Sequence, residues 1–378
     1  MIAMLNLTLP VVGLKELILD RLGGTAHHAS LFFSVEMVAY VIFAPLWGLI
    51  SDRLQRRKPL VVLGFLLSAL FYWSYTEVES VGLLLFLRFL QGAVTVAGWS
   101  TLMALGVDHA PANARGRSMG ILGAALSLGV SFGVPLGGYF VRDLGAEAPL
   151  LIAAGLFLAI GIGSLALAEG PELSRRVTVP EILSTLARQP RLALPYLFYF
   201  VDRYTVGLFV VVFPLYLASL GVADPAVKGR YLAAFLLPFA LLQVVAGRLA
   251  ERIGPRPLLI GGSIAYGALL TLVGVSGLSP LWWVMLGLGV LAALMFTPTL
   301  VLAAELSSPE TRGSAMAGYN VAGSLGFAVG PVVGAWAHHA RGFDFAFALA
   351  GVLEIACALF GLLLILHWRR RPGSEPRG

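Results

Sequence analysis

Several charged residues lie inside long apolar stretches, and the side chains of four of them are the first candidates for chemistry in this sequence. They are Glu36, Arg88, Asp202 and Arg203. Burying a charge at the centre of a bilayer costs at least ~2.5 kcal/mol on insertion scales, so a functional role is the default interpretation. A carboxylate in a low-dielectric site can bind and release a proton near neutral pH. Asp202 is therefore the predicted proton carrier, and a fixed ion pair with an arginine is the alternative.

Helical spacing places several of the polar residues on common faces. One stripe consists of Arg88, Gln91, Thr95 and Trp99. The alternative for Arg88 is a packing role, in which its guanidinium group only binds backbone carbonyls. Glu36 lies at a similar depth and either pairs with Arg88 or titrates alone. Asp202 and Arg203 are neighbours that point about 100° apart on a helix, so we expect them not to aim at one spot.

The apolar stretches must be membrane-spanning helices. The chain has 378 residues, of which 58% are hydrophobic and 12% charged, about half the charged fraction of a soluble domain. Apolar runs of 18 or more residues recur, and as a helix such a run spans the ~30 Å hydrocarbon core. The period-2 alternation of a membrane barrel is absent. The predicted fold class is an all-α membrane protein.

We expect twelve transmembrane helices in two six-helix repeats. The first six are predicted at roughly 1–20, 29–51, 59–77, 80–107, 115–141 and 147–168, and the second six at roughly 192–219, 229–250, 257–277, 279–306, 312–340 and 344–368. The domains are then an N-terminal bundle (1–168), a cytoplasmic linker (169–191), a C-terminal bundle (192–368) and a basic cytoplasmic tail (369–378). Capping-box spacing of Thr178 and Glu181 predicts a short amphipathic helix on the membrane surface within the linker.

The positions of the charges predict orientation and exclude several functions. Most lysines and arginines fall in loops on the side of both termini, which places that side in the cytoplasm of a plasma (inner) membrane. The net charge of +6 therefore flanks helices and does not indicate nucleic acid. One cysteine, Cys357, excludes an internal disulfide or a cysteine-based metal cluster. Catalytic and phosphate-loop motifs are absent, so we expect no enzyme activity, no cofactor and no metal.

The second half of the chain repeats landmarks of the first. Gly48, Asp52 and Arg53 correspond to Gly247, Glu251 and Arg252 at an offset of 199 residues, and Asp108 corresponds to Glu305 at 197. Internal repeats of six helices are typical of transporters whose substrate site lies between the halves. If Pro10 corresponds to Pro214, the first helix is shortened at its cytoplasmic end. Either the start codon is misassigned or this copy is truncated.

Several motifs resemble those of the major facilitator superfamily, and the resemblance covers essentially the whole chain. "GLISDRLQRRK" from Gly48 resembles its loop 2–3 signature, "RFLQG" from Arg88 its helix-4 motif, and "GVSFGVPLGG" and "GFAVGPVVG" its glycine-proline motif. The resemblance implies that helices 1, 4, 7 and 10 line the cavity, so the Arg88 stripe should face it. Glu354, on helix 12, is then peripheral and structural. Gln55 departs from the usual glycine, and P-L-G-G weakens the similarity to an antiporter signature.

The loop charges are candidates for a gate. By the resemblance, the loop aspartate Asp52 faces the N-terminus of helix 11, where the helix dipole favours an anion. Asp52 also stands four residues before Arg56, a spacing that suits an ion pair. Such a latch would bias a two-state rocking equilibrium; a purely topological role for the basic residues is the alternative. The gating set is Gly48, Asp52, Arg53, Arg56, Arg57 and Asp108, with Glu251, Arg252 and Glu305 in the second half.

The predicted function is proton-coupled efflux of small amphipathic molecules by alternating access. The predicted cavity stripe is aromatic and apolar, which suits lipophilic substrates. Two alternatives remain: a proton-coupled symporter that takes up a metabolite, and a non-transporting membrane sensor. A hydroxyl-rich solute favours more polar residues on the cavity helices than this sequence has, and a sensor normally carries a soluble output domain. The expected partners are a small-molecule substrate, protons and the lipid bilayer, and we expect a monomer.

Overall fold

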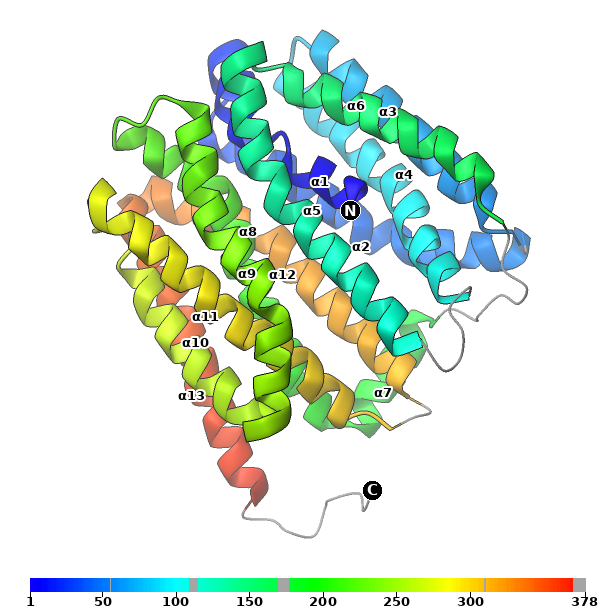
Figure 1. Cartoon of the computed structure of the whole chain (residues 1–378), viewed down its shortest axis with the longest axis vertical. Coiled ribbons are helices and arrows are strands. Elements are labelled where there is room, and N and C mark those ends of the chain that lie inside the picture. Colours follow the sequence, from blue (N-terminus) through cyan, green and yellow to red (C-terminus); the bar gives the residue numbers. More distant parts are fainter. Residues whose placement is uncertain (55, 109–114, 169–176, 309–310, 370–378) are drawn as a thin grey trace.

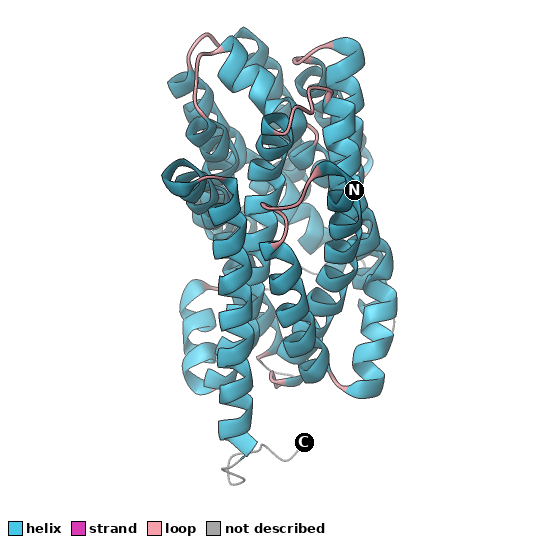
Figure 2. Cartoon of the chain, turned by 90° about the vertical axis from the view of Figure 1, so that its left-hand side faces the viewer, coloured by secondary structure: helices cyan, strands magenta, loops and turns pink. Residues whose placement is uncertain are grey.

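The computed structural model describes residues 1–54, 56–108, 115–168, 177–308 and 311–369. Within these ranges all the regular secondary structure is helical, and no strand occurs (Figure 2). The first set of helices comprises α1 (Ile2–Thr8), α2 (Ala26–Leu54), α3 (Lys58–Ser74), α4 (Val81–Asp108), α5 (Arg115–Leu144) and α6 (Ala148–Gly163). After the short α7 (Val179–Arg188), the second set comprises α8 (Ala193–Ser219), α9 (Pro225–Ile253), α10 (Pro255–Thr271), α11 (Leu278–Glu305), α12 (Arg312–Arg341) and α13 (Phe343–Arg369).

The helices are long and apolar enough for a multi-pass membrane protein. Among the described residues, nine helices meet the length and hydropathy expected of a membrane span, or up to ten if one bent pair counts as a single span. The predicted class, an all-α membrane protein, is confirmed. The count of twelve spans stays a prediction.

The two sets repeat each other in helix length. Helices α2 to α5 contain 29, 17, 28 and 30 residues, and α9 to α12 contain the same numbers in the same order. Each of α3, α4 and α5 begins 197 residues before its counterpart. The repeat seen in the sequence therefore has a counterpart in the backbone.

The first predicted helix is broken. The structure has α1, a 3₁₀ turn at Val11–Gly13 and a π-helical turn at Lys15–Arg21, with a bend of 42° between the two parts of this segment. Pro10 accounts for the end of α1 at Thr8, because proline lacks the N–H that a continuous helix needs and its ring clashes with the preceding turn. The 42° bend lies further on, between Gly13 and Lys15. Met1 lies beside Gly129, about halfway along α5 (Figure 1).

The connection between the sets contains the predicted amphipathic helix. Thr178 caps α7, and its backbone N–H donates to Glu181 Oε2 at 2.8 Å, which completes the capping box. The sequence prediction of a short helix is thus confirmed. Its place on the membrane surface stays a prediction.

The two sets meet along a seam formed by α5 with α9 and α2 with α12. We name the two ends of the bundle after glycines in their loops. The tight turn at Gly145, with φ of 97°, marks the Gly145 end, and the turn at Gly254 marks the Gly254 end. Only glycine adopts such φ values readily. The C-terminal end of α13 and α7 both lie at the Gly254 end (Figure 1).

Candidate functional site

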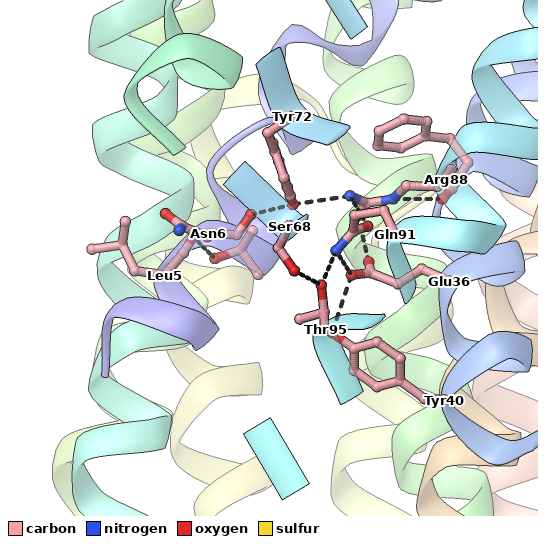
Figure 3. A network of polar contacts seen from close by, with 11 residues as sticks. Leu5, Asn6, Glu36, Tyr40, Ser68, Tyr72, Arg88, Gln91 and Thr95 are labelled. Carbon is pink, nitrogen blue, oxygen red and sulfur yellow. Dashed lines mark hydrogen bonds and ion pairs between the residues drawn. The ribbon is translucent and has the colours of Figure 1, made fainter. Parts of the chain in front are cut away.

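A buried ion pair between Glu36 and Arg88 lies at the centre of the first set (Figure 3). Helix α2 supplies the glutamate and α4 the arginine, and the two side chains are 1% and 0% exposed. Arg88 Nη2 contacts Glu36 Oε2, and Arg88 Nε donates to the carbonyl of Phe32 at 3.2 Å. The guanidinium group also lies 4.2 Å from the centre of the Phe32 ring. The charge is thus paired, hydrogen-bonded and covered by an aromatic face, as a buried charge requires.

A hydrogen-bond network extends from this pair across α3 and α4. Arg88 Nη1 donates to Gln91 Oε1 and to the Tyr72 hydroxyl, both at 2.9 Å. Gln91 Nε2 donates in turn to Glu36 Oε1 at 3.3 Å and to the Thr95 hydroxyl. Ser68 bonds Thr95. Residues three and four positions apart share a helix face, which explains how α4 presents this row.

The structure bears on the predicted stripe in two ways. Arg88, Gln91 and Thr95 do act together, and Glu36 pairs with Arg88 instead of standing alone. Trp99 is half-buried one turn further on, and no described contact joins it to the network. The guanidinium group points into the interior of the first set, because its hydrogen-bonding partners come from α2, α3 and α4. This differs from the expectation that the stripe faces the cavity between the halves.

Tyr40 connects the network to the seam. Its hydroxyl donates to Glu36 Oε1 at 3.1 Å (Figure 3). Its ring packs against the hydrophobic core that Phe33 and Met37 of α2 share with α8 of the second set. Any part of these residues in transport stays a proposal.

A second buried ion pair lies in the middle of α8. Asp202 Oδ2 accepts from Arg203 Nε at 2.9 Å and from Arg203 Nη2 at 2.8 Å, while Asp202 Oδ1 has no partner. The expectation that these neighbours do not aim at one spot is wrong. The arginine side chain is long enough to fold back onto the preceding carboxylate, whatever the angle between the two Cα–Cβ bonds.

Aromatic rings surround the Arg203 guanidinium group. Its central carbon lies 4.8 Å from the ring centre of Phe296, 5.3 Å from that of Tyr199 and 5.6 Å from that of Phe239. Tyr199 also stacks on Tyr319 of α12, with ring centres 3.9 Å apart. We call Tyr199, Phe239, Phe296 and Tyr319 the aromatic cluster. Arg203 keeps 16% of its side chain exposed, so the cluster is not sealed.

The predicted gate lies at the Gly254 end and is only partly described. The side chains of Asp52 and Asp108, at the ends of α2 and α4, lie outside the described part of the structure. Gly48 is buried, whereas the other side chains are exposed: Arg53, Arg56, Glu251, Arg252 and Glu305. Arg57 is an exception, because it is 1% exposed at the N-cap position just before α3. The latch stays a prediction.

Sequence reasoning missed three features of the structure. Lys228 is buried at the seam, with its Nζ 3.5 Å from Glu16 Oε1 of the first set. The aromatic cluster is assembled from four helices, so no local pattern reveals it. Glu354 is fully buried instead of peripheral, although its position in the most apolar of the candidate spans, with mean hydropathy 2.6, was a usable signal. Among described residues, no cluster of His, Cys, Asp and Glu is suited to a metal.

The sequence is similar to a family model and to known proteins along the whole chain. The family model described as Major Facilitator Superfamily matches residues 1–222 and again 195–378. The multi-drug resistance efflux pump PmrA of Streptococcus pneumoniae is 25% identical over 369 residues, covering 93% of this chain and 91% of the pump. The synaptic vesicular amine transporter of Rattus norvegicus is 23% identical over 87% of this chain and 65% of its own length.

Solved structures show the same fold. A bacterial homologue of the human lysosomal transporter Spinster, in an inward-facing and unoccupied conformation, superposes with a TM-score of 0.81. The match covers 99% of this chain and 97% of that one at 14% sequence identity. At this identity the likeness concerns the fold alone.

Proposed function

This chain belongs to the Major Facilitator Superfamily and is a multi-pass membrane transporter rather than an enzyme. On that premise we propose that it exports small amphipathic molecules in exchange for protons. Two moving bodies, residues 1–168 and 192–368, rock about the substrate in this proposal. The linker 169–191 joins them and 369–378 forms a basic tail. Both termini lie in the cytoplasm beneath the plasma (inner) membrane.

The Asp202–Arg203 pair is the observation that carries the proposal. Asp202 is buried in the middle of α8, and only one of its carboxylate oxygens is bonded. The free Oδ1 is a place for a proton to bind. Protonation removes the negative charge that holds Arg203, so the guanidinium group is released from its partner. A proton thereby neutralises the partner of Arg203 and frees this arginine to move within the aromatic cluster.

The aromatic cluster indicates the class of substrate. Flat rings with a few polar groups at their edges bind amphipathic and aromatic molecules well. The same ring faces that hold the Arg203 guanidinium group also attract organic cations. The names of two relatives, a multi-drug efflux pump and an amine transporter, agree with this class of substrate.

The latch predicted at Asp52 belongs to the same proposal. Asp52 and its counterpart Glu251 stand at the Gly254 end of α2 and α9. A charge-dependent contact there holds that end closed in one state and is released in the other. Hydrogen bonds and ion pairs near the Gly145 end serve the opposite state.

Transport by vesicles with an imposed pH gradient tests the proposal. We expect one or more of a panel of lipophilic cations, neutral drugs and organic acids to move against the direction of the protons. Movement in the same direction as the protons would instead mean uptake by symport. A panel that moves only down its own gradient, whatever the pH difference, would contradict proton coupling.

Asp202→Asn tests the carrier itself. Asparagine keeps the size of the side chain but cannot titrate, so we expect pH-driven transport to vanish while substrate binding in detergent and downhill exchange largely survive. Asp344→Asn, an exposed change at the start of α13, is the matched control and should transport normally. If Asp202 is only structural, the variant strands the buried Arg203 at a cost of about 3–5 kcal/mol. Expression and binding would then be lost together.

A further inference from the structure

Glu354 is a buried carboxylate that the proposed function does not use. It lies in α13, which packs against α10 and α8 (Figure 1). The glycines Gly267 of α10 and Gly351 of α13 allow a close crossing beside it, since a Cβ at Gly351 would stand 2.4 Å from the carbonyl oxygen of Gly267. Small residues permit such approaches between membrane helices. Glu354 is therefore sealed between helices and does not face lipid, as its 0% exposure shows.

No described cation compensates this carboxylate. Neither of its oxygens has a hydrogen-bond partner of ordinary geometry. The charged group that acts on it is Asp202 of α8, which is also negative and therefore repels it. Tyr266 of α10 and Cys357 of α13 are the other titratable groups within range, and neither side chain has a cationic form that could pair with a carboxylate. No described charged group of α12, which also packs on α13, acts on it.

Unpartnered hydroxyl groups gather around the same point. Ser263 Oγ lies near enough to interact with Glu354, and the Tyr266 hydroxyl lies within range of both Glu354 and Asp202, yet neither hydroxyl has a hydrogen bond of ordinary geometry. Thr205 stands next to Tyr266 and donates to the backbone carbonyl of Asp202 at 2.8 Å. Ser263 and Tyr266 thus offer Glu354 two hydroxyl groups that have no other hydrogen-bond partner of ordinary geometry.

An ionised carboxylate is costly to bury in these surroundings. A buried charge with no counter-ion is disfavoured so strongly that such groups take up a proton and become neutral. Protonation also gives Glu354 an O–H donor, so it can bond with the hydroxyls that now lack partners. We propose that Glu354, together with Ser263 and Tyr266, is a second proton-binding site and carries a proton in the conformation described. That this proton exchanges with Asp202 rests on the proposed function; that it is bound does not.

Infrared spectroscopy of the purified full-length protein in lipid tests the site without a substrate. A protonated carboxyl group has a C=O stretching band that a carboxylate lacks. We expect such a band at neutral pH, and we expect Glu354→Gln to remove it. The band should persist in Glu251→Gln, a matched change at an exposed glutamate of the same set, and in Asp202→Asn. A spectrum that Glu354→Gln leaves unchanged would overturn the proposal.

The infrared test is independent of transport, so a failed vesicle assay and a failed proton site are told apart.

Discussion

A single guanidinium group holds three helices of the first set together. Arg88 bonds Glu36 of α2 and Tyr72 of α3 from its own place on α4. Each partner also binds elsewhere, since Tyr72 donates to the carbonyl of Asn6 at 3.0 Å and Glu36 accepts from Tyr40. In buried networks the loss of one member leaves the others unsatisfied, so the whole arrangement depends on the arginine.

Replacing Arg88 by alanine should destabilise the protein. The change leaves Glu36 buried without a cation, and breaking a buried pair in this way costs about 3–5 kcal/mol. Arg53→Ala, exposed at the end of α2, is the matched control and should alter stability by less than about 0.5 kcal/mol. Glu36→Gln combined with Arg88→Met removes both charges and should recover most of the loss. Thermal unfolding in detergent measures all three, and a double variant as unstable as Arg88→Ala would argue against the pair.

The sequence indicated which residues are candidates for chemistry better than it indicated which residues they interact with. Spacing placed Arg88, Gln91 and Thr95 on one face because three- and four-residue steps are fixed by the helix itself. The choice between paired and solitary Glu36 stayed open, since it depends on how α2 and α4 meet. The Asp202–Arg203 pair was misjudged because side-chain length outweighed the direction of Cβ.

At the scale of elements, long apolar runs located most helices closely. The predicted 115–141 and 312–340 became Arg115–Leu144 and Arg312–Arg341, for example. The exception is the first helix, where the backbone effect of Pro10 outweighs the continuous apolar run. How the helices pack against one another depends on small residues instead. A single sequence shows where these residues are but not which helix packs against them. Gly138 and Gly229 at the seam are such residues.

Gly138→Ala should open the seam at the Gly145 end. An added Cβ would stand 2.5 Å from the carbonyl oxygen of Pro225, which is backbone and cannot turn aside. We therefore expect α5 and α9 to separate by about 1–2 Å, the usual size of helix shifts at packed interfaces. Spin labels at the exposed positions Asp143 and Ala223 report this distance. Gly155→Ala, where the added atom meets open space, should leave the distance unchanged. If the distance is the same in both variants, the added methyl group is accommodated without separating α5 from α9, which would contradict the prediction.

At the scale of the whole molecule, three of the described contacts that join the two sets lie from the middle of the seam toward the Gly145 end. Ser131 of α5 donates to the carbonyl of Leu236 in α9 at 2.9 Å, and Phe33 of α2 packs on Phe327 of α12 with ring centres 5.2 Å apart. The pair of Glu16 and Lys228 lies nearer that end. The conformation described is thus held closed there. If that end faces the outside, as the distribution of basic residues predicts, the conformation described is closed to the outside.

The orientation of the bundle is itself a prediction that labelling can decide. Leu144, 67% exposed, stands at the Gly145 end, and Ser184 is exposed on α7 near the Gly254 end. Cysteine is introduced at each position in turn, since Cys357, the one native cysteine, is buried. A membrane-impermeant maleimide added to intact cells should label position 144 but not 184, because basic loops remain in the cytoplasm. Lysed cells should label both positions, which controls for reactivity. The reverse pattern in intact cells would show that the predicted orientation is wrong and that the closed Gly145 end faces the cytoplasm.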